Sequence, residues 1–272
     1  MARLFAEKVA VNNDDDYLRR YDDFDFRSRF GALVDRLDFP RLITVLEFER
    51  LVAKHEISAG RVLMLNGGPD GDPELALLEH RHVDRADFDE DPARFDLHNP
   101  RFDRSDYDFA ILSQTLEHLY DPGLSVAHLF AALAPGGHVW ASVPTVSQQH
   151  SMPYHFTTGF TPIGFACLFA HAGFEVVESG QWGNNDYVTQ TFALGGFPTY
   201  YDLSLHWRGI RHLGWTLLTP TAWRRMAGRR LRLPVSSLVE DGLRNDFERP
   251  AQTWVLARKP SDPRAPAGAQ GA

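Results

Sequence analysis

The chain has 272 residues, 43% of them hydrophobic and 24% charged, which is the composition of a folded domain and excludes disorder as the main state. Its formal net charge of −8 at pH 7 argues against a dedicated nucleic-acid-binding protein, because such domains carry basic patches. The single cysteine, Cys167, excludes an intrachain disulfide, and no apolar run approaches the roughly 20 residues that span a bilayer. We therefore expect a cytoplasmic protein with no secretory signal and no membrane-spanning segment.

The first part of the chain, residues 1–60, is predicted to be mostly helical, because apolar side chains recur there at helical spacing. These side chains belong to Leu42, Val45, Phe48 and Val52. The rest of the chain alternates short apolar runs with helical segments. The expected strands are 61–65, 82–84, 108–113, 138–143, 174–178 and 253–257, and the expected helices are 73–80, 122–133 and 162–172. Such alternation predicts an α/β fold with a mostly parallel sheet.

The order of these elements suggests a core that is interrupted once. The segment between the last two strands is too long for a bare loop, so we expect a helical insertion there. The last residues are rich in proline, alanine and glycine and are predicted to be disordered. The expected organisation is a helical segment (1–60), a core (61–182), an insertion that forms a substrate lid (183–252), a final core strand (253–259) and a tail (260–272).

A glycine-rich turn follows the first predicted strand. Ligands of open α/β sheets bind at the carboxyl ends of the strands, and glycine there lets the backbone approach a ligand closely. An acidic residue near the end of the next strand can accept hydrogen bonds from ribose hydroxyls, which favours Asp84, with Asp87 as a second candidate. On these residues alone, a purely structural turn is an equally good interpretation.

Several segments in a fixed order make the signal more specific. They are VLMLNGGPDG (62–71), DLHNP (96–100), DYDFAILSQTLEHLYDP (106–122), LAPGGHVWASVP (133–144), the run from 155 to 184 that contains AGFEVVE, and TWVLARK (253–259). Together they resemble the class I S-adenosylmethionine-dependent methyltransferases of the small-molecule branch, the methyltransferase type 11/23 group. The resemblance implies an enzyme with a Rossmann-like, seven-stranded, mostly parallel sheet, with helices on both faces, an antiparallel last strand and a helical insertion before it.

The resemblance also implies a cofactor, S-adenosyl-L-methionine, and a position for each part of it. The glycine-rich turn would face the amino-acid part, Asp84 would hold the ribose, Asp96 and Leu97 would bracket the adenine, and Gln114 would lie near the methyl group. The residues of the turn are Asn66, Gly67, Gly68 and Gly71.

This sequence departs from the family pattern at the turn and after it. Met64 stands where an acidic residue is usual, and Asn66 and Asp70 stand where glycines are usual. Asp96 follows Asp84 by only 12 positions, so the second crossover helix is expected to be short or missing. These departures motivate an alternative, a methyltransferase-fold protein that acts as a binding or scaffold subunit or catalyses another reaction. A nicotinamide dehydrogenase is disfavoured because the G-x-G-x-x-G spacing is absent.

Three histidines are candidates for a general base that would take a proton from an acceptor hydroxyl, ranked His155 and His118 first and His150 after them. Each is also open to a role in packing or capping. Their loose spacing is not a metal-ligand signature, so no metal is expected. Cys167 lies in an apolar helix and is expected to be an inert thiol.

The insertion carries an unusual charge pattern. Residues 203–239 contain seven arginines, three tryptophans and no acidic residue. This segment could pack as a lid with a solvated basic face, bind an anionic substrate, lie on an anionic membrane surface or contact nucleic acid.

We expect O-methylation of a small molecule, such as a sugar, a glycolipid precursor or a natural-product scaffold, with no nucleic-acid partner. The oligomeric state is left open.

Overall fold

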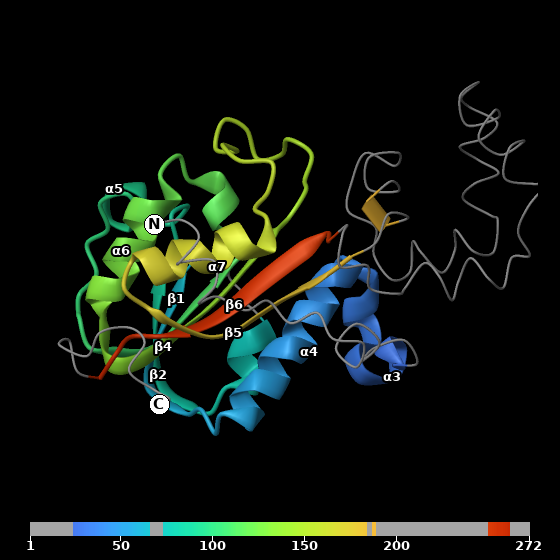
Figure 1. Cartoon of the computed structure of the whole chain (residues 1–272), viewed down its shortest axis with the longest axis horizontal. Coiled ribbons are helices and arrows are strands. Elements are labelled where there is room, and N and C mark those ends of the chain that lie inside the picture. Colours follow the sequence, from blue (N-terminus) through green and yellow to red (C-terminus); the bar gives the residue numbers. More distant parts are fainter. Residues whose placement is uncertain (1–23, 66–72, 184–186, 189–249, 262–272) are drawn as a thin grey trace, which may run out of the picture. The chain divides into compact units, whose positions relative to one another are not determined.

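The computed structural model describes residues 24–65, 73–183, 187–188 and 250–261 (Figure 1). The glycine-rich turn, residues 1–23 of the predicted helical segment, almost all of the predicted insertion and residues 262–272 of the predicted tail lie outside the described residues. The chain divides into two compact units. The larger unit comprises Met1–Asn13, Thr44–Gln181 and Gln252–Ala272, and the smaller one comprises Asp14–Ile43 and Trp182–Ala251.

The larger unit is built on one sheet with the strand order β2-β1-β3-β4-β6-β5. Neighbouring strands from β2 to β4 are parallel, and β6 is antiparallel to β4. The strands are β1 (Ala59–Leu65), β2 (His80–Ala86), β3 (Tyr107–Ser113), β4 (Leu133–Pro144), β5 (Glu175–Trp182) and β6 (Gln252–Arg258). The predicted α/β class, the mostly parallel sheet and the antiparallel last strand are confirmed.

The expected seventh strand is not found among the described residues, whose sheet has six strands. The segment between β2 and β3 contains only one short helix, α5 (Pro92–Phe95). A further parallel strand would need a crossover connection on each side, and one such connection takes a dozen or more residues. The chain between Ala86 and Tyr107 is too short for that, so the prediction of seven strands is wrong for this part of the chain.

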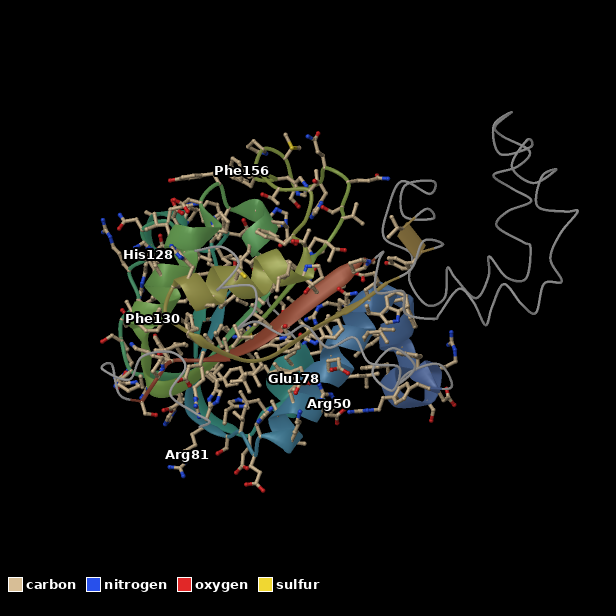
Figure 2. All side chains as sticks on the ribbon, in the orientation of Figure 1. Arg50, Arg81, His128, Phe130, Phe156 and Glu178 are labelled. Carbon is tan, nitrogen blue, oxygen red and sulfur yellow. The ribbon has the colours of Figure 1, made fainter. Side chains whose placement is uncertain are left out.

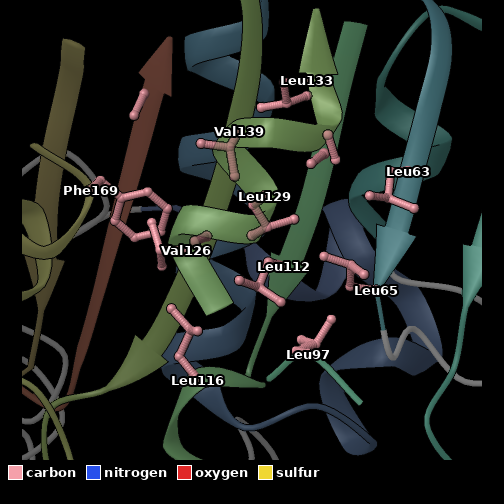
Figure 3. Close-up of a cluster of buried hydrophobic side chains, with 14 of the residues drawn as sticks. Leu63, Leu65, Leu97, Leu112, Leu116, Val126, Leu129, Leu133, Val139 and Phe169 are labelled. Atoms are coloured by element: carbon pink, nitrogen blue, oxygen red, sulfur yellow. The ribbon is translucent and has the colours of Figure 1, made fainter. Parts of the chain in front are cut away.

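Helices cover both faces of the sheet. Two of them, α6 (Pro122–Ala132) and α7 (Pro162–His171), lie on one face, where buried side chains of β1 and β3 meet them (Figure 3). Their common core includes Leu63, Leu65, Leu112, Val126, Leu129 and Phe169, none of them more than 1% exposed. Both helices begin with a proline after a capping side chain, since Asp121 accepts from the backbone of Leu124 and Thr161 from that of Gly164.

The other face is covered by α4 (Phe39–Lys54), the helix predicted from its apolar spacing. The ring of Phe48 is fully buried and packs edge-on against Phe109 of β3 and Trp140 of β4, at centroid distances of 5.9 and 5.3 Å. Arg50 of the same helix forms ion pairs with Glu47 and with Glu178 of β5 (Figure 2). The predicted apolar positions of this helix are all buried.

Strand β4 begins earlier than predicted. The Pro-Gly-Gly sequence at 135–137 indicates a turn, yet Gly136 donates to the carbonyl of Lys259 and Lys259 donates to that of Gly137, so the chain is already extended there. A side chain at Gly137 would meet the carbonyl oxygens of Ala134 and Tyr107 at 2.9 Å. Glycine thus allows the close approach of the neighbouring strand.

The described part of the smaller unit contains α3 (Phe26–Phe30), the 3-10 helix η1 (Gly31–Asp35) and the start of α4. Its core is aromatic. Phe39 lies 4.7 Å from Phe26 and 4.8 Å from Trp182, measured between ring centroids, and Trp182 lies 5.5 Å from Tyr187. Across all the described residues, no helix has the length and apolarity to cross a membrane.

His138 of β4 makes the fold sensitive to acid. Burial, Arg258 and His55 lower its pKa to about 4. Between pH 6.5 and 4 the unfolded chain therefore binds a proton at this residue that the folded chain does not bind, so the free energy of unfolding falls as the pH falls. We expect His138→Gln to reduce the loss of stability between pH 6.5 and 4.5 by roughly 2–3 kcal/mol. Urea unfolding at the two pH values measures this change.

The matched control for this prediction is His82→Gln, because His82 is exposed. If the His138→Gln variant and the wild type lose the same free energy of unfolding between pH 6.5 and 4.5, His138 is not the group responsible.

Candidate functional site

A pocket of about 410 Å³ lies at the carboxyl ends of β2 and β3. This is the edge of a parallel sheet at which ligands of open α/β folds bind. Its walls come from the loop after β2, from α5 and the residues that follow it, from the 3-10 helix η3 (Leu116–His118), and from the loop after β4. The lining residues are Asp87, Phe88, Asp89, Phe95, Asp96, Leu97, His98, Gln114, Thr115, His118, Leu119, Tyr120, Ser151, Tyr154 and Phe156.

The two acidic candidates near the end of β2 have different surroundings. Asp84 lies inside the strand, opposite Leu63, with its carboxylate 3.7 Å from the guanidinium of Arg61. Burial and the hydrogen bond to Asp84 raise the pKa of the Tyr107 hydroxyl to about 12, so this hydroxyl donates to the Asp84 carboxylate at neutral pH. Asp84 does not line the pocket, whereas Asp87, just beyond the strand end, does. The structure therefore places the second candidate, and not the first, at the pocket.

Asp96 and Leu97 both line the pocket. Oδ1 of Asp96 accepts hydrogen bonds from the backbone N–H of His98, at 3.0 Å, and from its Nδ1, at 2.7 Å. Burial opposes the charge of Asp96, but the bonds from His98 outweigh it and lower the pKa of this carboxyl. Nε2 of His98 accepts from the backbone N–H of Asp121, and the ring stacks on Tyr120 at 3.7 Å. The charged carboxylate is thus held in a fixed position.

Gln114 is the first residue after β3 and also lines the pocket. Its φ of 53° is unusual for a residue with a side chain, and such backbone angles often occur at functional sites. The backbone N–H of Gln114 donates to the carbonyl of Ser142 at 2.8 Å, which ties the end of β3 to β4. The strand end is therefore turned sharply into η3.

One buried acidic side chain near the strand ends was not predicted. Glu74, in the 3-10 helix η2 (Pro73–Leu77), is fully buried and accepts hydrogen bonds from Ser113 and from the indole N–H of Trp140. The turn residues Asn66, Gly67, Gly68 and Gly71 lie outside the described residues, and β1 ends at Leu65, just before them. Glu74 supplies a buried carboxylate near this edge, in a chain that has Met64 where an acid is usual.

The three candidate histidines lie close together, and His118 is the one among them that lines the pocket. The ring centroids are 4.9 Å apart for His118 and His150, 4.5 Å for His150 and His155, and 5.7 Å for His118 and His155. The carbonyl of Glu117 brings them together, because it accepts from the backbone N–H groups of Phe156 and Thr157 and so joins η3 to the loop after β4. Phe156 is labelled on this loop in Figure 2.

Hydrogen bonds assign the protons of these rings. Nδ1 of His118 faces the carbonyl of Tyr154 at 2.8 Å and Nδ1 of His150 faces the carbonyl of Gln148 at 2.9 Å, so both nitrogens must donate. The proton of neutral His118 is therefore on Nδ1, which leaves Nε2 with a lone pair. Burial and the neighbouring His150 lower the pKa of His118 and of His155, so both rings are neutral at pH 7.

Glu117 lies beside this histidine cluster with its carboxyl group buried. Burial raises its pKa to about 8, and Oε2 has no hydrogen-bond partner among the described residues. Oε1 lies 4.0 Å from Nε2 of His118. The carboxyl is therefore mostly protonated at neutral pH, and no cation of the described residues neutralises it.

The loop after β4 folds back on itself at Gly159. The backbone N–H of Ser147 donates to Thr158 at 2.6 Å, and a Cβ at Gly159 would lie 2.1 Å from the carbonyl oxygen of Thr145. We expect Gly159→Ala to displace the loop and the histidines on it and to destabilise the fold by about 1–3 kcal/mol. Thermal unfolding and limited proteolysis of the loop measure the two effects.

Gly123→Ala is the matched control, because a Cβ there meets its neighbours only at ordinary contact distances of 3.4 Å and more. This variant should keep its stability or gain slightly. If Gly159→Ala is as stable as Gly123→Ala and resists proteolysis equally, the backbone contact does not hold the loop.

A mostly parallel sheet with one antiparallel strand, with its pocket at the strand ends, defines a Rossmann-like protein. The model of the methyltransferase domain family matches residues 44–179, which is half of the chain and nearly all of the longest segment of the larger unit, Thr44–Gln181. The chain belongs to the methyltransferase domain family. This confirms the class expected from the sequence, an S-adenosylmethionine-dependent methyltransferase.

Comparison with curated protein sequences finds no match. Among solved structures, the [4+2]-cyclase SpnF is 16% identical, with a TM-score of 0.42 over 93% of this chain and 99% of that one. The 1,6-didemethyltoxoflavin-N1-methyltransferase of Burkholderia thailandensis is 16% identical, with a TM-score of 0.43 over 93% and 94%. The N-methyltransferase NodS of Bradyrhizobium japonicum is 16% identical, with a TM-score of 0.39 over 67% and 91%.

Proposed function

We propose that the chain transfers a methyl group from S-adenosylmethionine to a hydroxyl oxygen of a small molecule. One observation carries this proposal. A single pocket has the carboxylates of Asp87 and Asp96 at the strand ends and, on another wall, His118. His118 belongs to a cluster of three histidines with His150 and His155. Methyl transfer is an in-line displacement that mainly requires alignment of two bound molecules, and a hydroxyl acceptor also has to lose a proton.

The acidic side of the pocket is the proposed place of the cofactor's adenosine. Asp87 would accept from the two ribose hydroxyls, and Asp96 from the exocyclic amine of the adenine, beside Leu97. Gln114 would lie near the transferred methyl group, and the turn at 66–71 would face the amino-acid part. This is the arrangement expected from the sequence, with Asp87 in the place of Asp84.

The histidine side is the proposed place of the acceptor. His118 lines the pocket and is neutral, with the lone pair of Nε2 available for a proton. The acceptor hydroxyl would give its proton to this nitrogen as its oxygen attacks the methyl carbon and the sulfonium leaves as a neutral thioether. His155 and His150 would keep the group neutral and in place.

The rim of the pocket favours an acceptor with flat or ring-shaped surfaces. Tyr120, Tyr154 and Phe156 line the pocket and are 65%, 52% and 51% exposed, which is unusual for large aromatic side chains. No lysine or arginine is among the described residues that line it. An anionic group on the substrate would therefore need the arginines of 203–239, and the sugar, lipid-linked or natural-product nature of the acceptor stays a prediction.

The direct test incubates the protein with S-adenosylmethionine and a panel of hydroxylated sugars, glycosides and phenols, with matched amines as comparison. Release of S-adenosylhomocysteine reports transfer, and mass spectrometry with NMR locates the new methyl group. We expect a methyl ether as the product. Transfer to the amines alone would contradict the oxygen assignment, and binding of the cofactor with no transfer to any acceptor would favour the scaffold alternative.

A further inference from the structure

We propose that His118, His150 and His155 form a three-histidine site for a divalent transition-metal ion, with Zn²⁺ as the first candidate. One ring nitrogen from each residue lies within 4.8 Å of the other two. Their sequence spacing gave no sign of this, because η3 contributes one ring and the loop after β4 contributes two. The inference does not rest on methyl transfer, since it concerns what the chain binds.

The hydrogen bonds indicate which ring nitrogen of His118 and of His150 would bind the ion. A histidine that binds a metal usually donates its other ring N–H to a carbonyl or another oxygen, which fixes the ring. His118 and His150 each donate from Nδ1 to a backbone carbonyl. In both rings this leaves Nε2 as the nitrogen that would bind the ion.

His155 completes the set through its other nitrogen. The hydroxyl of Ser147 donates its one proton to the carbonyl of Thr158 at 3.1 Å, so toward Nε2 of His155, at 3.5 Å, it acts as an acceptor. The proton of His155 is therefore on Nε2, and Nδ1 has the lone pair. Nδ1 is also buried and has no hydrogen-bond partner among the residues that the structure describes. A buried polar nitrogen without a partner calls for an explanation, and a bound ion supplies one.

The spacing requires only a small contraction. Zn–N distances of about 2.1 Å in a tetrahedral site place the nitrogens roughly 3.4 Å apart, so nitrogens now within 4.8 Å of one another would move closer by up to about 1.4 Å. Two of the three rings are on a loop, where such a movement disturbs no strand or helix. Imidazole nitrogens suit Zn²⁺ and the neighbouring transition metals better than Mg²⁺ or Ca²⁺, which prefer oxygen.

The site would lie beside the pocket, which His118 lines. The buried carboxyl of Glu117 lies next to it, with Oε1 4.0 Å from Nε2 of His118. Three protein ligands leave at least one coordination position for a water or a substrate oxygen, as in catalytic zinc sites. An acceptor hydroxyl bound there would lose its proton more readily, so Nε2 of His118 would then act as a ligand and not as a base.

The test is a metal titration of the full-length chain after removal of any affinity tag and of bound metal. Competition with a fluorescent zinc chelator measures affinity, and the visible spectrum of the Co²⁺ form reports coordination by nitrogen. We expect one equivalent of Zn²⁺ with a Kd below about 1 µM. His150→Ala should weaken binding by at least about 100-fold, more than a change outside the ligand set does.

Two further variants make the result decisive. His82→Ala removes an exposed histidine of β2 and should bind zinc as the wild type does. His155→Ala should lose the Co²⁺ spectrum, and circular dichroism with thermal unfolding establishes that each variant is folded. Equal zinc affinity in the wild type and the folded His150→Ala protein would overturn the proposal. A loss of zinc affinity in His82→Ala as large as that in His150→Ala would also overturn it.

Discussion

The Asp87→Asn variant is expected to bind S-adenosylmethionine roughly 10- to 100-fold more weakly than the wild type, because each hydrogen bond to a charged group contributes about 1.5–3 kcal/mol. Asp87 lines the pocket directly after β2, where its carboxylate would accept from the ribose. The amide keeps the size of the side chain and removes its charge. Isothermal titration calorimetry with S-adenosylmethionine and with S-adenosylhomocysteine measures the change.

Asp84→Asn is the matched control, since it removes a carboxylate from the same strand. Asp84 is engaged by Arg61 and Tyr107 and does not line the pocket, so its loss should change cofactor affinity by less than about threefold. The opposite pattern, with a large loss in Asp84→Asn and a small one in Asp87→Asn, would restore the assignment made from the sequence and exclude the one made from the structure.

The His118→Gln variant is expected to lower kcat by about 10²- to 10⁴-fold while the affinity for S-adenosylmethionine stays within about threefold. Glutamine can still form hydrogen bonds, but it cannot take a proton at neutral pH. The same loss of kcat is expected if Nε2 of His118 binds a metal ion. This result therefore tests whether His118 takes part in catalysis, and it does not distinguish a general base from a metal ligand. Steady-state kinetics with the acceptor identified in the panel gives kcat and KM separately.

The control for this variant is His82→Gln, whose side chain is exposed on β2, away from the pocket lining. It should leave both constants unchanged. Full turnover by His118→Gln would remove the histidine from the catalytic machinery and leave it a packing role.

The sheet could be predicted from the sequence because its strands are short apolar runs between strong helix and turn signals. Strand β3 and helices α6 and α7 lie within a few residues of their predicted bounds. The number of strands was predicted less accurately than the positions of these elements. The short spacing between Asp84 and Asp96 already indicated that a crossover was reduced, but the family pattern of seven strands outweighed it.

The site was predicted in part. Asp96, Leu97, Gln114 and His118 line the pocket. Gln114 and His118 come soon after a strand whose end was recognisable, whereas Asp96 and Leu97 were chosen from the family resemblance alone. The choice between Asp84 and Asp87 depended on where β2 ends, which the sequence did not show. Asp84 lies inside the strand and Asp87 lies just beyond its last residue. Contacts between distant segments, such as Glu74 with Trp140, leave no local signal in the sequence. The clustering of the three histidines arises in the same way, from η3 and the loop after β4.

The central claim is that the pocket at the ends of β2 and β3 holds the cofactor. Hydrogen–deuterium exchange of the full-length chain, with and without saturating S-adenosylhomocysteine, tests this claim most directly. We predict slower exchange in the segments around 86–90, 95–98 and 113–119, which form the pocket walls, and little change in α4 or β5. Saturable binding with no protection of these three segments would contradict the account.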